Sequence, residues 1–232
     1  MGKKSSFFVP EKEEANLKVS AQSSTDYFSD LKEGLKYIKN HSLVIRVVFI
    51  SAIYVFLFVP AGLLKPLQAT RNFGTDVWRL TAVEITFSAG MLAGGVLVGI
   101  WGGLKKRVYT MALSFLLCGL LIIGLGFITS FWLYLALLLL LGFTSPLTDA
   151  PFISILQTTV DHSFIGRVFS VVMTVINTMR ILGMLFFGLA ADIVSINILC
   201  LATGVIILLL SVPMVLTRKE EGQSTKSARA LS

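Results

Sequence analysis

The 232-residue chain is 55% hydrophobic and only 14% charged, and its mean hydropathy is +0.82. A soluble domain carries roughly 25% charged residues and has no means of covering this much apolar surface, so that class is excluded. Disorder of the whole chain and a disulfide-stapled secreted domain are excluded as well, because the hydrophobicity is too high and there are only two cysteines. The composition predicts a multi-spanning membrane protein with about six spans.

The first 42 residues are too polar to cross a membrane. Residues 1–25 predict a disordered cytoplasmic linker. Residues 26–42 predict an amphipathic cytoplasmic helix, because large apolar residues recur there at spacings of three and four, namely Tyr27, Phe28, Leu31, Leu35 and Ile38. Its basic face suits an anionic inner leaflet, and packing on the protein is an equal alternative.

Residues 43–216 predict an all-α bundle of six transmembrane helices, each near the ~20 residues that cross the hydrocarbon. The spans are about Leu43–Leu64, Leu80–Trp101, Val108–Ile128, Phe131–Thr158, Val168–Ala190 and Ile196–Leu216. The fourth contains Pro146 and Pro151, so it is expected to be tilted, kinked or protruding. Residues 217–232 predict a cytoplasmic tail.

The distribution of Lys and Arg predicts the orientation. Alternate loops between the six spans lie on opposite sides of the membrane. Most of the 20 basic residues fall on one side, in the N-terminal segment, the loop Lys105–Lys106–Arg107, the loop with Arg167, and the C-terminal tail. Only Lys65, Arg71 and Arg79 fall on the other side. By the positive-inside rule both termini are cytoplasmic, so the net charge of +7 reflects topology in a cell membrane and implies no nucleic-acid partner.

Ionisable residues within the spans are the candidates for a substrate or ion pathway. Glu84 either belongs to this pathway or snorkels to the interface and pairs with Arg79, and Asp149 is either functional or structural. Arg180 lies deep enough to need a partner or water. We expect Glu84 and Arg180 to face one another or a common wet cavity.

Uncharged polar residues extend the set of pathway candidates. Gln157 and Asn177 either line a cavity or hold helices together.

Glycines and prolines give two further signals. The spacing of Gly90 and Gly94, repeated by Gly95 and Gly99, predicts close approach of a neighbouring helix. Helix-breaking residues fall at corresponding places in spans one and four, which favours a 3+3 inverted repeat; they are Pro60, Gly62 and Pro66, and Gly142, Pro146 and Pro151.

Four segments together carry a likeness to a known family: residues 157–170 (QTTVDHSFIGRVFS), 183–192 (GMLFFGLAAD), 90–107 (GMLAGGVLVGIWGGLKKR) and 30–38 (DLKEGLKYI). They resemble exporters of the major facilitator superfamily, in particular its macrolide-efflux and enterobactin-exporter branch. The likeness covers about residues 26–216. The ordered set is far more specific than any one segment.

This resemblance implies the carboxy-terminal six-helix half of a twelve-span transporter. Spans one and four would then face a central cavity, and spans two and five would flank it. Spans three and six would support the other four from outside the cavity. The likeness places Lys105, Lys106, Arg107, Gly166 and Arg167 in cytoplasmic gate loops. Arg180 departs from the family, which usually has an apolar stretch there.

The leading hypothesis is therefore half of a proton-driven drug or macrolide exporter that works by alternating access. Its expected partners are the bilayer, a small amphipathic substrate, and an amino-terminal six-span half or a second copy. The alternative is a self-contained six-span solute-binding subunit of a multi-component importer. The sequence contains no HExxH, GxSxG or metal-ligand cluster, so neither an enzyme nor a cofactor or metal is expected.

Overall fold

The computed structural model describes residues 33–101 and 107–230, and within these ranges every regular element is an α-helix. The predicted linker at residues 1–25, the first turns of the predicted amphipathic helix, and Lys105 and Lys106 lie outside the described residues. Residues 33–40 are helical, and the larger helices are α2 (Ser42–Gly62), α3 (Lys65–Phe73), α4 (Val77–Trp101), α5 (Arg107–Phe127), α6 (Phe131–Thr159), α7 (Ile165–Ile193) and α8 (Ile196–Ala230).

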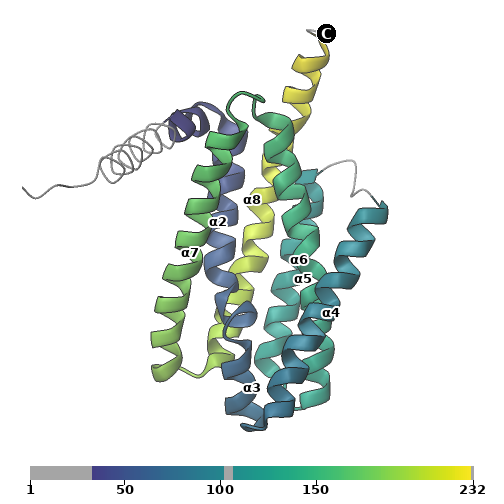
Figure 1. The fold of residues 1–232 in the computed structure, drawn as a ribbon, viewed down its shortest axis with the longest axis vertical. Coiled ribbons are helices and arrows are strands. Elements are labelled where there is room, and N and C mark those ends of the chain that lie inside the picture. Colours follow the sequence, from purple (N-terminus) through teal and green to yellow (C-terminus); the bar gives the residue numbers. More distant parts are fainter. Residues whose placement is uncertain (1–32, 102–106, 231–232) are drawn as a thin grey trace, which may run out of the picture.

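The described residues contain six helical stretches that are long and apolar enough to cross a membrane, as the sequence predicts. The spans are Ser42–Phe73, Val77–Ile100, Arg107–Phe127, Phe131–Thr159, Ile165–Ile193 and Ile196–Met214. Most bounds agree with the predicted ones within three residues. The last helix continues beyond its span to Ala230, where it projects past the bundle (Figure 1).

The first span differs most from its prediction. The chain turns at Leu63 and Leu64 and then resumes as α3, whose first turn holds Pro66. Proline is well accommodated there because its missing N–H has no partner within the helix at that position. Lys65 directly follows the predicted end of the first span, and it is only 6% exposed because α3 folds back onto the bundle.

The fourth span is one unbroken helix through Pro146 and Pro151. Proline removes a backbone donor, but transmembrane helices tolerate it where hydroxyl side chains and neighbouring helices satisfy the backbone. The hydroxyl of Thr144 donates to the carbonyl oxygen of Leu141 at 2.7 Å, and that of Thr148 donates to Thr144 at 3.4 Å. Both residues are buried.

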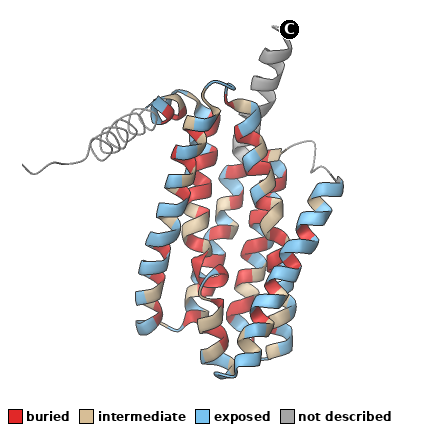
Figure 2. Ribbon diagram, in the orientation of Figure 1, coloured by how far each residue is buried: buried red, intermediate tan, exposed pale blue. Residues whose placement is uncertain are grey.

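The helices pack in the spatial order α7, α2, α8, α5, α6, α4, which differs from the chain order. The α5–α8 contact is the largest, which agrees with a supporting position for the third and sixth spans. Helices α4 and α7 end the row and are the most exposed (Figures 1 and 2). Contacts of α6 with α2 and α7 are few, so the row forms two arms, α2 with α7 and α4 with α6.

Glycines let the α4–α6 arm close tightly. A Cβ placed at Gly90 or Gly94 would collide with the backbone of Leu139 or Phe143 on α6. Gly142 packs in the same way on the backbone of Phe87. The prediction from the Gly90–Gly94 spacing is confirmed, whereas Gly95 and Gly99 face open space.

Residues 33–40 are held against the start of α7. Glu33 forms an ion pair with Arg167 at 2.7 Å, and Gly34 lies against the Arg167 backbone. Tyr37 stacks on Phe164 and donates its phenolic O–H to Asp161 at 3.3 Å. Burial raises the pKa of Tyr37 above its ordinary value, so the phenol keeps the proton that it donates.

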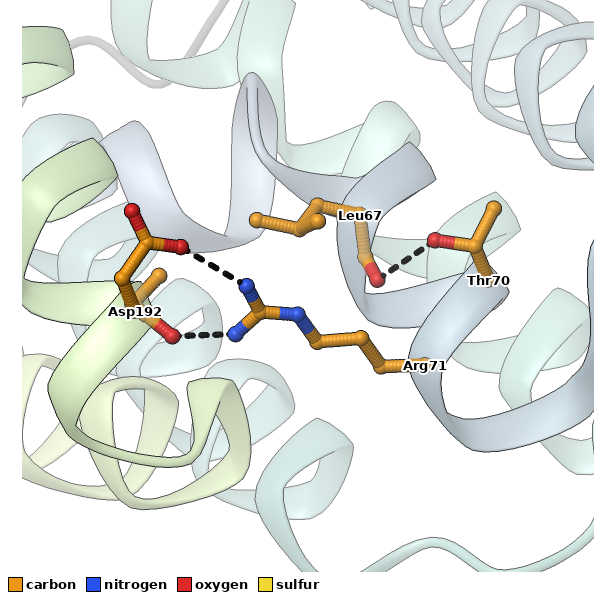
Figure 3. Close-up of polar contacts among 5 residues, drawn as sticks. Leu67, Thr70, Arg71 and Asp192 are labelled. Carbon is orange, nitrogen blue, oxygen red and sulfur yellow. Dashed lines mark hydrogen bonds and ion pairs between the residues drawn. The ribbon is translucent and has the colours of Figure 1, made fainter.

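The opposite end of α7 is held by α3. The Arg71 guanidinium forms an ion pair with Asp192 at 3.0 Å and also donates to the carbonyl oxygen of Ala191 (Figure 3). A cation is favourable at this place because the last carbonyls of a helix lack partners and carry partial negative charge. Helix α7 therefore packs along α2 and is fixed at both ends.

Candidate functional site

A cavity of about 270 Å³ lies between the two arms of the bundle. Helices α2, α4, α6 and α7 contribute to its lining, together with the first residue of α3. Much of the wall is aromatic or aliphatic, including Tyr54, Phe58 and Phe87. Three charged side chains also line it, namely Lys65, Asp149 and Arg180.

The aromatic wall is well supported from behind. The ring of Tyr54 stacks between Phe58 and Phe115, with ring centroids 5.6 Å and 4.3 Å away. Its hydroxyl lies 3.4 Å from the Cys118 sulfur on α5. These contacts fix the ring in one position and anchor this face of the cavity to the supporting helix.

Lys65 is a buried cation whose contacts are satisfied. Its ammonium lies 3.2 Å from the Glu84 carboxylate and donates to the carbonyl oxygen of Gly62 at 3.2 Å. The same ammonium sits 3.9 Å from the centroid of the Phe87 ring, a cation–π geometry. The Lys65–Glu84 pair thus joins α3 to α4 beside the cavity.

Glu84 accordingly has a different partner from the two expected from the sequence. It pairs with Lys65, while Arg79 pairs with Asp76 at 3.1 Å. Arg180, expected opposite Glu84, lies on the cavity with Asp149. The expectation that Glu84 and Arg180 face one another or a common cavity was wrong, because Glu84 is held by Lys65 and is not among the lining residues.

Asp149 and Arg180 face this cavity from opposite arms. Asp149 comes from α6 and Arg180 from α7, and the charge of Arg180 acts electrostatically on Asp149. Neither makes a hydrogen bond or an ion pair with any other residue that the structure describes. The nearby hydroxyls of Thr144 and Thr148 on α6, which could satisfy Asp149 in a structural role, donate to backbone carbonyl oxygens.

The remaining sequence candidates lie away from this lining. Gln157 and Asn177 are exposed and are not among its lining residues. Arg107 joins the start of α5 to the end of α6 by donating to the carbonyl oxygen of Ser154 at 3.0 Å. Gly166 is exposed with open space around it, and Arg167 holds Glu33.

Two features of the site escaped the sequence reasoning. Lys65 was used only to predict the orientation, although a lysine between Pro60 and Pro66 in an apolar stretch indicates a broken helix with a functional charge. The aromatic lining has no such signal, because Tyr54, Phe58 and Phe87 look like ordinary residues of apolar helices.

The Lys65–Glu84 pair predicts a stability effect. Glu84→Gln is expected to lower the free energy of unfolding by about 1–2 kcal/mol, because it leaves the Lys65 ammonium buried without a counter-charge. The cost is smaller than for a fully buried pair because Glu84 is 54% exposed. Adding Lys65→Met should restore part of the loss, measured by SDS titration of the purified protein in micelles.

Asp76→Asn provides the matched control for this cycle. It removes a half-exposed carboxylate from the local Asp76–Arg79 pair and should change the free energy of unfolding by less than about 0.5 kcal/mol. Equal effects of Asp76→Asn and Glu84→Gln would show that the Lys65 pair has no special energetic role.

Comparison with known proteins identifies the class to which this six-span bundle belongs. The family model described as Major Facilitator Superfamily matches residues 9–231. The chain belongs to the major facilitator superfamily, as the sequence resemblance implies. The family's members are membrane transporters rather than enzymes, and this chain is a multi-pass membrane protein.

Among characterised relatives, the chain is similar to Macrolide efflux protein A. Identity is 24% with the Streptococcus pyogenes protein, covering 82% of this chain and 48% of the relative, and 24% with the Enterococcus faecalis protein, covering 68% and 50%. The Bacillus subtilis MFS-type transporter YfiS is 24% identical over 92% of this chain and 52% of its own length. The chain spans about half the length of these relatives.

Proposed function

We propose that this chain is the carboxy-terminal half of a secondary transporter that exports a small amphipathic molecule by alternating access, driven by the proton gradient. The complete pathway forms when a second six-span unit covers the cavity. That unit is an amino-terminal half or a second copy of this chain.

The single observation that supports the proposal most is the cavity between the arms. It combines an aromatic wall with Asp149 and Arg180, which come from helices of different arms. Charged side chains within a transmembrane bundle are costly and typically mark a substrate or ion pathway. Helices α4 and α7, which end the row, both contribute residues to the cavity, and in this proposal a second bundle completes its wall.

The similarity to macrolide efflux proteins supports export of an amphipathic substrate, and the half-length coverage supports the need for a second unit. The 3+3 repeat remains part of the proposal, because two triplets of helices related by inversion would rock as units around a central site. The family match favours this proposal over a solute-binding subunit of an importer.

The proposed topology places both termini in the cytoplasm. The Arg107 contact with α6 and the Glu33–Arg167 pair then lie at the inner end of the bundle, and α3 lies at the outer end. The helix of residues 33–40 would transmit movement of the preceding segment to α7. Gly166 and Arg167, predicted to lie in a gate loop, belong to the first turn of α7, which in this topology lies at the inner end.

An efflux assay tests the proposal. The assay uses inverted membrane vesicles that contain this chain together with its second unit. That unit is the six-span segment encoded upstream or, if the upstream sequence encodes no such segment, a second copy of this chain. These vesicles should take up a radiolabelled macrolide when their lumen is acidified. Collapse of the proton gradient should abolish uptake. Vesicles reconstituted with no more than one copy of this chain each, and no other unit, should be inactive. Uptake by that chain alone, or uptake insensitive to the gradient, would overturn the corresponding part of the proposal.

A further inference from the structure

Two opposite charges on the cavity have no close partner. Arg180 offers five N–H donors and Asp149 offers two acceptor oxygens, yet neither forms a hydrogen bond or ion pair with a described residue. The two side chains are farther apart than an ion pair, and both residues are exposed. Unpaired charges within a membrane bundle are costly, so binding of a molecule that pairs with both is favourable.

The third charge on the cavity does not compete for such a molecule. Lys65 already has Glu84, the Gly62 carbonyl and the Phe87 ring around its ammonium. The groups left to recognise a ligand are therefore one cation and one anion. A purely anionic ligand would be repelled by Asp149, and a purely cationic one by Arg180.

The rest of the cavity selects an apolar body. Tyr54 and Phe58 present aromatic surface, and Val55, Val59 and Met91 add aliphatic surface. A volume of about 270 Å³ admits a molecule the size of an aromatic amino acid. Walls of this kind gain free energy when they cover apolar surface, and a few polar groups then fix the orientation.

We propose that the cavity binds an amphipathic zwitterion, with an anionic group on Arg180, a cationic group on Asp149 and an apolar body against Tyr54 and Phe58. A ligand of this kind neutralises both charges at once and adds no net charge to the membrane interior. The assignment rests on the proposed function, because it names the substrate class of the same cavity.

The test uses one scaffold in four charge forms. The ligands are tritiated forms of phenylalanine (zwitterion), phenethylamine (cation), N-acetylphenylalanine (anion) and N-acetylphenylalaninamide (neutral). Their binding to the purified full chain in nanodiscs is measured at pH 7. Phenylalanine is expected to bind about tenfold more tightly than either singly charged form, because each of those loses one charged contact. The neutral form should bind most weakly.

Two variants reverse the selectivity in opposite directions. In Asp149→Asn the anion should bind at least as tightly as the zwitterion, and in Arg180→Gln the cation should do so. Arg71→Gln, which removes an arginine outside the cavity, should leave the order unchanged. A reversal of this kind cannot come from misfolding, because unfolding weakens all four ligands together.

Three results would overturn the inference. They are equal affinities of the four forms, a selectivity that Asp149→Asn and Arg180→Gln leave unchanged, and no binding of any form up to about 10 mM. The efflux assay separates this failure from failure of the proposed function. Gradient-driven uptake of the macrolide, together with no charge selectivity among the four forms, would reject the zwitterion and leave the transporter proposal standing.

Discussion

Gly94→Leu is expected to lower the free energy of unfolding by about 3 kcal/mol and to force α4 away from α6. A Cβ at position 94 would already collide with the backbone of Phe143, and backbone has no alternative rotamer with which to move aside. Leucine adds three more carbons at the same point. The measurement is SDS titration of unfolding in micelles, followed by the change in helical circular dichroism.

Gly95→Leu provides the matched control, because it makes the same substitution one position along the same helix. Position 95 is exposed, and nothing lies within 4 Å of a Cβ placed there. Its expected effect is stabilising by up to about 1 kcal/mol, since leucine is a better helix former than glycine. Comparable losses from both variants would mean that the α4–α6 contact does not depend on glycine.

The same pair of positions shows how far the sequence predicts the packing. The four-residue spacing of Gly90 and Gly94 identifies a surface for close approach, and so does that of Gly95 and Gly99. Only the first pair meets α6. The spacing along one helix shows which residues share a face. Which of two glycine faces packs against another helix depends on where the neighbouring helix lies.

The spans themselves are predictable because their signal is local. About 20 consecutive apolar residues have to cross the hydrocarbon wherever they stand in the fold. The α3 helix was missed because residues 65–73 are polar on average and short, so they have no local membrane signal. Their position depends on long-range contacts such as the Tyr134 hydroxyl donating to the Lys65 carbonyl oxygen at 2.9 Å.

The candidate site was predictable in its charges but not in their pairing. Glu84, Asp149 and Arg180 were recognised because ionisable residues are costly in a membrane. Counting residues along each helix predicts that Glu84 and Arg180 lie at a similar depth in the membrane. It does not predict which helices are neighbours at that depth. The order of helices in space decides that Lys65 reaches Glu84 and that Arg180 shares a cavity with Asp149.

Gln68→Ala is expected to cost about 3–4 kcal/mol, the other large effect in the molecule. Gln68 is 0% exposed, and its side-chain amide donates at 3.0 Å both to the Leu125 carbonyl on α5 and to Asn197 on α8. Its carbonyl oxygen lies 3.4 Å from the Tyr134 hydroxyl on α6. Truncation leaves these buried groups unsatisfied and opens a cavity among three helices.

Gln68→Leu separates the two causes, because it nearly keeps the volume and removes only the hydrogen bonds. Its expected cost is about 2 kcal/mol in the same SDS titration. Gln157→Ala, on an exposed glutamine of α6, should change the free energy of unfolding by less than about 0.5 kcal/mol. If Gln68→Ala were as mild as Gln157→Ala, α3 would not hold this end of the bundle together. Because α3 also carries Lys65 and Arg71, a loosened α3 should release both the cavity wall and the end of α7.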